Sequence, residues 1–339
     1  MITASVRPRQ HHTCTWQQEL ATAITRPEEL AAALGLAPET LAAATAAAGL
    51  FPLRVPRSFL ARIRPGDPHD PLLRQILPVG EELAEHPGYG ADPVGEQAAV
   101  RAPGLLQKYQ GRALLITTAT CAVHCRYCFR REFPYGGQDS GPRWSEALAE
   151  IARDASLREI ILSGGDPLSL SNARLESLVR SLSGIPHVER IRVHTRQPVV
   201  LPSRVDEGLL RWLRSAPLPI VVVLHINHPR EIDDPVAQAC AALRATGITL
   251  LNQSVLLAGV NDDAGVLTEL SERLFQVGVL PYYLHVLDPV RGAAHFAVPE
   301  DRARALAGTL AARLPGYLVP RLARETPAAA AKVVLSPGL

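Results

Sequence analysis

Six short apolar runs, each bounded by turn residues, constrain the fold of this chain more than any other feature of its sequence. They occupy residues 112–119, 158–165, 188–195, 218–227, 247–257 and 279–288. Stretches with the spacing of amphipathic helices lie between them, and one more covers 300–314. Strict alternation of buried strands with helices is typical of parallel α/β folds. The sequence therefore predicts a partial (βα)6 barrel.

Polar residues gather where these runs end. Cysteines follow the first run, and the other strand-end residues are Gly164, Gly165, Asp166, His194 and Asp288. Parallel α/β barrels build their active sites at the carboxyl ends of their strands. A doubly wound open sheet would need a glycine-rich phosphate turn after its first strand, where this chain has cysteines. The pattern favours a barrel with its site at this rim.

We expect three regions along the chain. Residues 1–105 contain short Ala/Leu-rich helices and Pro/Gly-rich irregular stretches, and they predict a layer that wraps around the rest. Residues 106–315 form the barrel core. Residues 316–339 are a short carboxyl-terminal segment.

Composition limits the classes of protein to consider. Hydrophobic residues make up 47% of the 339 positions, which is enough for a sizeable core. No apolar run reaches the roughly 18 residues of a membrane span, and the amino-terminal stretch lacks the apolar segment of a signal peptide. We expect a cytoplasmic protein without a membrane partner, in which thiols stay reduced. The near balance of 35 basic and 33 acidic residues argues against a nucleic-acid partner.

Three of the five cysteines stand close together in CAVHCRYCFRR, residues 121–131. Cys121, Cys125 and Cys128 form a C-x3-C-x2-C pattern on the loop after the first predicted strand. Iron–sulfur clusters usually have four thiolate ligands, so three leave one iron open for a small molecule. The alternative is a structural zinc site completed by a histidine, with the candidates His124, His11 and His12. Structural zinc usually takes two separated pairs of ligands, and no second pair of suitable spacing occurs here.

Lysine is rare in this chain. Only two of the 35 basic residues are lysine, Lys108 and Lys332. An amine can lose its proton and react with an aldehyde, which a guanidinium does not do. Lys332 is therefore a candidate for chemistry. Lys108 precedes the first predicted strand, so we expect it at the far end of the barrel as a surface charge.

The cysteine pattern after a first barrel strand resembles the cluster motif of the radical S-adenosylmethionine superfamily. The resemblance implies a [4Fe–4S] cluster held by Cys121, Cys125 and Cys128, with S-adenosylmethionine on the open iron. The aromatic residue before the last cysteine, Tyr127, also matches.

A second motif supports this resemblance. The stretch LSGGDPL, residues 162–168, is similar to the glycine-rich strand end that contacts S-adenosylmethionine in that superfamily. We therefore assign Gly164, Gly165 and Asp166 to cofactor binding, together with His194 at the end of the next strand.

Longer motifs resemble the lysine 2,3-aminomutases in particular. They are RVHTRQPVVLPSR (192–204), NQSVLLAGVND (252–262) and PYYLHVLDPVRGAAHF (281–296), and they follow in the order of that family. The resemblance implies pyridoxal 5′-phosphate carried on a lysine near the carboxyl terminus, which here is Lys332.

The same resemblance assigns further residues one by one. Arg112 matches an arginine that pairs with the phosphate of pyridoxal phosphate, and Gln253 matches a glutamine on the cofactor face. Arg130 matches an arginine that binds the substrate carboxylate. Asp288 and Glu325 match two acids that hold the ε-ammonium of lysine. The implied reaction converts (S)-α-lysine to (R)-β-lysine, with electrons from an external donor.

Two features separate this chain from the lysine 2,3-aminomutases of lysine catabolism. It reads ETPAAAAK before Lys332, where they carry a glycine-rich run, and it is more compact. It is closer to the branch that makes (R)-β-lysine for elongation factor P, where a separate ligase attaches the product. The family also allows a homo-oligomer. The alternatives are a related aminomutase acting on glutamate or arginine, and a zinc-binding protein that contacts nucleic acid.

Overall fold

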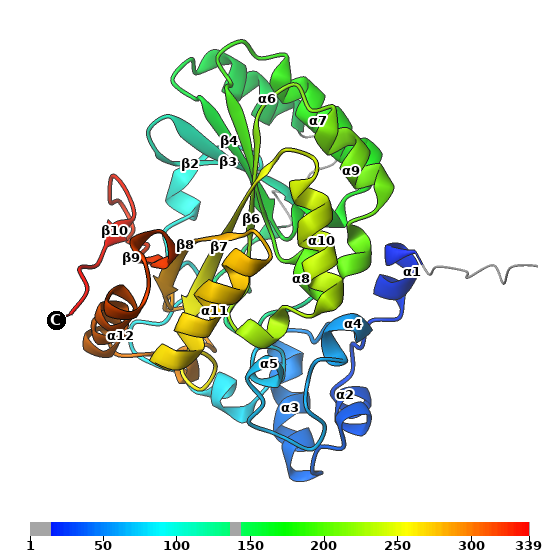
Figure 1. The fold of residues 1–339 in the computed structure, drawn as a ribbon, viewed down its shortest axis with the longest axis vertical. Coiled ribbons are helices and arrows are strands. Elements are labelled where there is room, and N and C mark those ends of the chain that lie inside the picture. The colour runs from blue at the N-terminus through cyan, green and yellow to red at the C-terminus, as the bar shows by residue number, and fades with distance from the viewer. Residues whose placement is uncertain (1–14, 136–143, 339) are drawn as a thin grey trace, which may run out of the picture.

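The computed structural model describes residues 15–135 and 144–338. Its centre is a ten-stranded sheet with its strands in the order β1 to β10 (Figure 1). Six parallel strands form the middle of the sheet: β3 (Arg112–Thr118), β4 (Glu159–Gly164), β5 (Arg190–Thr195), β6 (Ile220–Leu224), β7 (Thr249–Leu256) and β8 (Leu280–Val286). They coincide with the six predicted runs, so the prediction of a partial (βα)6 barrel is confirmed.

Helices cover the outer face of this sheet (Figure 1). They are α6 (Trp144–Arg153), α7 (Asn172–Ser183), α9 (Glu207–Arg214), α10 (Asp234–Arg244), α11 (Ala264–Gln276) and α12 (Glu300–Arg313). Helix α7 shows the reason, because Leu175, Leu178, Val179 and Leu182 recur at helical spacing and all enter the core. Burial of each such leucine contributes about 1.5–3 kcal/mol to the stability of the fold.

The remaining short elements are α8 (Gln197–Val200) and the 3-10 turns η1 (Gly80–Leu83), η2 (Gln97–Ala99), η4 (Pro167–Ser169), η5 (Pro202–Arg204), η6 (Pro229–Glu231), η7 (Ala294–Phe296) and η8 (Gly316–Leu318).

The amino-terminal layer packs beside the barrel in the lower part of Figure 1. Its helices are α1 (Trp16–Ala21), α2 (Pro27–Leu34), α3 (Glu39–Leu50), α4 (Arg57–Leu60) and α5 (Pro71–Arg74). Its hydrophobic core also includes Ala122 and Val123 from the cysteine loop. The layer therefore helps to fix the loop that carries the predicted cluster ligands.

Four short strands extend the sheet beyond the six that the sequence predicts. Strands β1 (Val100–Ala102) and β2 (Leu105–Tyr109) run antiparallel before β3, with Gly104 and Gly111 in left-handed conformations at the two turns. Strand β9 (Arg321–Arg324) lies parallel to β8, and β10 (Val333–Val334) returns antiparallel to β9. Their length hides them from periodicity, yet they carry Lys108 and bring Lys332 to the barrel.

Among the described residues, no helix combines the length and the apolar character needed to cross a bilayer.

The glycine pair after β4 fits closely against the start of the cysteine loop. A Cβ atom on Gly165 would lie 2.5 Å from the backbone oxygen of Thr120, and Gly164 has a φ of +115°. The backbone of Gly165 also donates a hydrogen bond to Thr118, at 2.6 Å. Only glycine permits this approach, so strand β4 and the cysteine loop are locked together.

We therefore expect Gly165→Ala to destabilise the fold by about 1–3 kcal/mol, because the added methyl group forces backbone to move. Gly184→Ala is the matched control, since its Cβ would meet nothing closer than 3.4 Å at a helix end with φ of −75°. The measurement is the urea midpoint of each variant. Equal midpoints for Gly165→Ala and the control would contradict this account of the glycine pair.

Candidate functional site

A cavity of about 430 Å³ lies on the side of the sheet opposite the helices. This volume is within the range of small-molecule sites. Every site residue predicted from the sequence lines it: Arg112, Cys121, Cys125, Cys128, Arg130, Gly164, Gly165, Asp166, His194, Gln253, Asp288, Glu325 and Lys332. The structure thus brings the predicted cluster ligands and the predicted cofactor lysine to one cavity. The role of each residue stays a prediction.

The two-residue period of the strands explains how polar side chains come to face this cavity. Leu162 and Val193 point into the core beneath the helices, whereas Ser163 and His194, one position further along each strand, line the cavity. Gln253 enters the cavity from β7. The same alternation that builds the core therefore builds the polar interior.

The cysteine loop is fixed by a buried ion pair. Arg126 is fully buried and donates from Nε and Nη2 to the two carboxylate oxygens of Glu82, at 2.8 and 2.6 Å.

Burial raises the pKa of the Cys121 thiol well above its usual range and that of the Cys128 thiol to about 11. These thiols are protonated at neutral pH, so loading a metal cluster must displace protons.

The zinc interpretation finds no support in this geometry. Across residues 15–135 and 144–338, no three Cys, His, Asp or Glu side chains converge so as to hold one metal ion. In a cluster the thiolates bind separate irons, so they need not converge in this way. The ring of His124 is engaged elsewhere, with Nδ1 2.9 Å from the carbonyl oxygen of Pro52. The other two candidates, His11 and His12, lie outside the described residues.

Asp166 organises the strand ends around the cavity. Its carboxylate accepts hydrogen bonds from the backbone N–H groups of Leu168, Arg196 and Gln197 and from the hydroxyl of Thr195, at 2.7–3.0 Å. Burial raises the pKa of Asp166, and these hydrogen bonds favour its ionised form. These contacts of Asp166 thus hold β4 to β5, in addition to any contact that it makes with a cofactor.

Arg130, the predicted carboxylate clamp, is held by an acid that the sequence analysis missed. Glu96 accepts from Nε and Nη2 of Arg130 at 2.7 and 2.6 Å, and both side chains are buried. Nη1 donates to Ser163 Oγ at 2.9 Å. Glu96 thus occupies the bidentate edge of the guanidinium, and Nη1 also donates to the carbonyl oxygen of Gly164 at 3.2 Å. These contacts fix the plane of the guanidinium, and a substrate carboxylate would meet a preoriented group at the N–H that remains. Nothing in the sequence around Glu96 signals this pairing.

The amine of Lys332 forms an ion pair with Glu325. The antiparallel pairing of Val333 with Arg324 places the two side chains opposite each other. Although burial opposes ionisation, Lys332 and Lys108 lower the pKa of Glu325 to about 2.

In the turn between Glu325 and Lys332, Ala328 adopts a φ of +61° that glycine would adopt without strain.

The expectation that Lys108 is a surface charge is wrong. Its Nζ lies 3.0 Å from Glu325 Oε1, its side chain is 18% exposed, and it lines the cavity. Tyr109 donates to the same oxygen at 2.8 Å. The error arose because strand β2 reverses before β3, which brings Lys108 beside the carboxyl-terminal segment. Arg112, over the ring of Tyr109 at 4.6 Å, adds a third cation to Lys108 and Lys332 at this end of the cavity.

Three partly buried groups along the cavity have displaced pKa values. Burial and then the charge of Glu325 raise the pKa of Asp288 to about 7. Burial and then the charge of Lys332 lower the pKa of His285 to about 3. Burial and then the positive charge of Arg192 lower the pKa of His194 well below its usual range. The cavity therefore holds neutral imidazoles and one carboxyl group that titrates near neutrality.

Comparisons with known proteins agree with this geometry. The family described as the radical SAM superfamily matches residues 115–268. The chain is 50% identical to "L-lysine 2,3-aminomutase" of Escherichia coli over 91% of both chains, and 46% identical to that of Haemophilus influenzae over 91% of this chain and 92% of the relative. It is 34% identical to that of Clostridium subterminale, over 95% of this chain and 78% of the relative.

The chain belongs to the lysine 2,3-aminomutase family. Its place in the radical SAM superfamily implies a [4Fe–4S] cluster and S-adenosylmethionine. A solved radical SAM methyltransferase from Sphaerobacter thermophilus is 22% identical, with a TM-score of 0.45 over 65% of this chain and 68% of that one. Membership of this family overturns the interpretation as a zinc-binding, nucleic-acid-contacting protein.

The position of Asp288 predicts a pH dependence. Its carboxyl group takes up a proton as the pH falls through about 7 and then no longer offers a charge to an ammonium group. We expect kcat/KM for lysine to fall about tenfold for each pH unit below 7. In Asp288→Asn this acid limb of the pH profile should be absent, and kcat/KM should be low at every pH. In Glu325→Gln the fall in kcat/KM should remain but move to lower pH, because the charge of Glu325 contributes to the raised pKa of Asp288. Persistence of the limb in Asp288→Asn would contradict the assignment.

Proposed function

We propose that this protein is a radical S-adenosylmethionine, pyridoxal-phosphate-dependent aminomutase that converts L-α-lysine to (R)-β-lysine. One observation carries the proposal: the amine of Lys332 and the thiols of Cys121, Cys125 and Cys128 line the same cavity. A cluster and an aldehyde cofactor could act on one substrate only if their ligands shared a site in this way. The printed names of the relatives support the reaction class.

The side chains present suit the groups that this chemistry requires. His194 Nε2 is buried without a hydrogen-bond partner in the described structure, and it lines the cavity as a ready donor or acceptor for a bound molecule. Arg112 and Lys108 provide cationic groups suited to a phosphate near the amine of Lys332. When bound, the cluster with S-adenosylmethionine supplies hydrogen-atom abstraction, and pyridoxal phosphate supplies a carrier for the migrating amino group.

Glu325 would control the amine of Lys332. Its carboxylate holds the ammonium form through their ion pair. Lys332 must give up a proton to react with an aldehyde. Because Lys332 and Lys108 hold the pKa of Glu325 at about 2, its carboxylate would orient the amine rather than keep that proton. Lys108 would keep Glu325 partnered once the amine of Lys332 is neutral.

Arg130 and Asp288 would define the two ends of the substrate. The preoriented guanidinium of Arg130 suits an α-carboxylate. Asp288 and Glu325 suit the distant ε-ammonium and would repel the side-chain carboxylate of glutamate. The second candidate, an aminomutase acting on another amino acid, would use the same cysteines and Lys332. These acids favour a basic substrate.

We further propose that the product serves the modification of elongation factor P by a separate ligase in the cytoplasm, with electrons from an external donor. The support is the 50% identity over 91% of both chains to the Escherichia coli relative, against 34% identity and 78% coverage for the Clostridium relative. Free lysine is the proposed substrate. The test is to incubate the reconstituted protein with S-adenosylmethionine, reductant and lysine, arginine or glutamate, and to identify β-isomers by mass spectrometry.

Lys332→Ala should abolish covalent attachment of pyridoxal phosphate and reduce β-lysine formation at least 1,000-fold, because the reactive amine is lost. Borohydride reduction followed by peptide mass spectrometry measures the attachment. Lys332→Arg is the matched control, since it keeps the positive charge beside Glu325 but cannot bind an aldehyde. Both variants should retain the cluster absorbance of the wild type. Pyridoxal phosphate attached elsewhere in the wild type, or β-lysine made by either variant at wild-type rate, would refute the cofactor assignment.

A further inference from the structure

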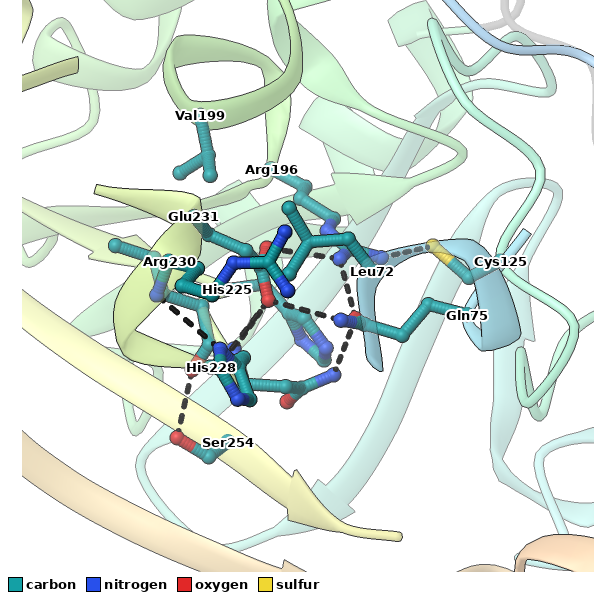
Figure 2. A network of polar contacts seen from close by, with 12 residues as sticks. Leu72, Gln75, Cys125, Arg196, Val199, His225, His228, Arg230, Glu231 and Ser254 are labelled. Carbon is teal, nitrogen blue, oxygen red and sulfur yellow. Dashed lines mark hydrogen bonds and ion pairs between the residues drawn. The ribbon is translucent and has the colours of Figure 1, made fainter. Parts of the chain in front are cut away.

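Arg196 lies directly after β5, beside the cysteine loop, and the site described above gives it no role. Its backbone N–H is held by Asp166 at 2.8 Å, and its residue surface is 6% exposed. Figure 2 shows its guanidinium at the centre of a buried polar network, directed at the sulfur of Cys125. A buried cation aimed at a predicted cluster ligand requires a physical account.

The guanidinium is held from both sides. Nη1 donates to Cys125 Sγ at 2.8 Å and to the hydroxyl of Tyr127 at 2.6 Å. Nη2 donates to Gln75 Oε1 at 2.6 Å and to Glu231 Oε2 at 2.9 Å (Figure 2). The donor that faces the sulfur is therefore fixed by contacts that do not involve the sulfur.

Glu231 is itself fully constrained. It is completely buried, and its other carboxylate oxygen, Oε1, accepts from the backbone N–H groups of Asn227 and His228 at 2.9 and 3.1 Å and from Gln75 Nε2 at 3.1 Å. A network with this many satisfied partners in a low-dielectric interior resists rearrangement. The amino-terminal layer, through Gln75, and the 3-10 turn η6, through Glu231, thus jointly position Arg196.

Cys125 is distinguished from its two neighbours by this contact. Among the described residues, a charged side chain, Arg196, donates a hydrogen bond to one cysteine of the cluster loop, and that cysteine is Cys125. Hydrogen bonds to the sulfurs and the net charge around a cluster set its reduction potential. A hydrogen bond to a sulfur and a nearby positive charge both stabilise the reduced state, because it is the more negative one. Residues behind the ligands commonly tune a metal site in this way.

We propose that Arg196 donates its hydrogen bond to the Cys125 thiolate of the bound cluster and raises the cluster's reduction potential, while Glu231 limits that rise by partly neutralising the guanidinium. Arg196 is thus a positioning residue that makes one-electron reduction of the cluster easier. The inference rests on the cluster of the proposed function and deepens it.

The test is a potentiometric titration of the reconstituted, full-length protein at fixed pH, followed by the electron paramagnetic resonance signal of the reduced cluster. Arg196→Gln should shift the potential to a more negative value, since both charge and fork geometry are lost. Arg196→Lys should shift it less. Glu231→Gln should shift it to a more positive value, because the guanidinium loses its counter-charge. Shifts of opposite sign at two contacting residues distinguish tuning from general disruption of the site.

Arg204→Gln is the matched control. Arg204 is also fully buried, but it donates to the backbone oxygens of Leu168 and Leu170 and to no cysteine within the described residues. Its replacement should leave the potential unchanged. The inference is overturned if Arg196→Gln assembles a cluster with the wild-type potential, or if Arg196→Gln and Glu231→Gln shift in the same direction.

A measurement on the wild type keeps the inference testable should the variants fail to fold. Electron–nuclear double resonance of the reduced cluster should reveal an exchangeable proton coupled through the Cys125 thiolate, and its absence would overturn the assignment. Failure of the proposed function looks different, because the wild type would then assemble no cluster or make no β-isomer. A wild type that makes β-lysine with no effect of Arg196 on the potential refutes this inference alone.

Discussion

The in-register pairing of six parallel strands is the constraint on which the rest of this structure depends. Leu162 pairs with Leu115 and with Val193, and each of these packs beneath the outer helices. Because side chains alternate along a strand, that pairing also commits Ser163 and His194 to the interior. A shift of one residue in any strand would exchange a core leucine for a cavity residue. The stability of the hydrophobic core and the composition of the cavity are therefore two results of one register.

The cysteine loop is held between two structures that contribute differently to it. On the sheet side, the close approach of Gly165 to Thr120 leaves no room for a side chain at this position. On the other side, the buried pair of Arg126 with Glu82 ties the loop to the amino-terminal layer. Breaking one partner of a buried pair leaves an uncompensated charge, which costs about 3–5 kcal/mol. The amino-terminal layer is thus part of the functional site, although the sequence analysis assigns it no site residue.

The sequence predicts what periodicity and motif spacing can encode. The six strands and the cysteine pattern follow from local patterns, whereas the meeting of Lys332 with the cysteines is implied by the family resemblance and depends on the short strands β9 and β10. The side of the barrel on which Lys108 lies, and the pairing of Glu96 with Arg130, could not be predicted. Both depend on short antiparallel or irregular segments whose partners are distant in sequence, and no local period records which acid meets which base. Ion pairs of this kind become visible only once the fold has placed them.

Charge balance in the cavity connects these unexpected pairs to the proposed reaction. Arg130 is paired with Glu96, whereas Lys332 and Lys108 share the carboxylate of Glu325, as expected for ions that need partners in a weakly solvated interior. Lysine would enter with a further net positive charge, which these cations would resist. Asp288, with a pKa of about 7, can release a proton as the ammonium arrives and so supply the missing negative charge. Glutamate would bring a second carboxylate beside Asp288 and Glu325, and Asp288 would then stay protonated and offer no charge to bind it. Under the proposed function, the cavity would therefore favour a basic amino acid through the negative charge that Asp288 can acquire.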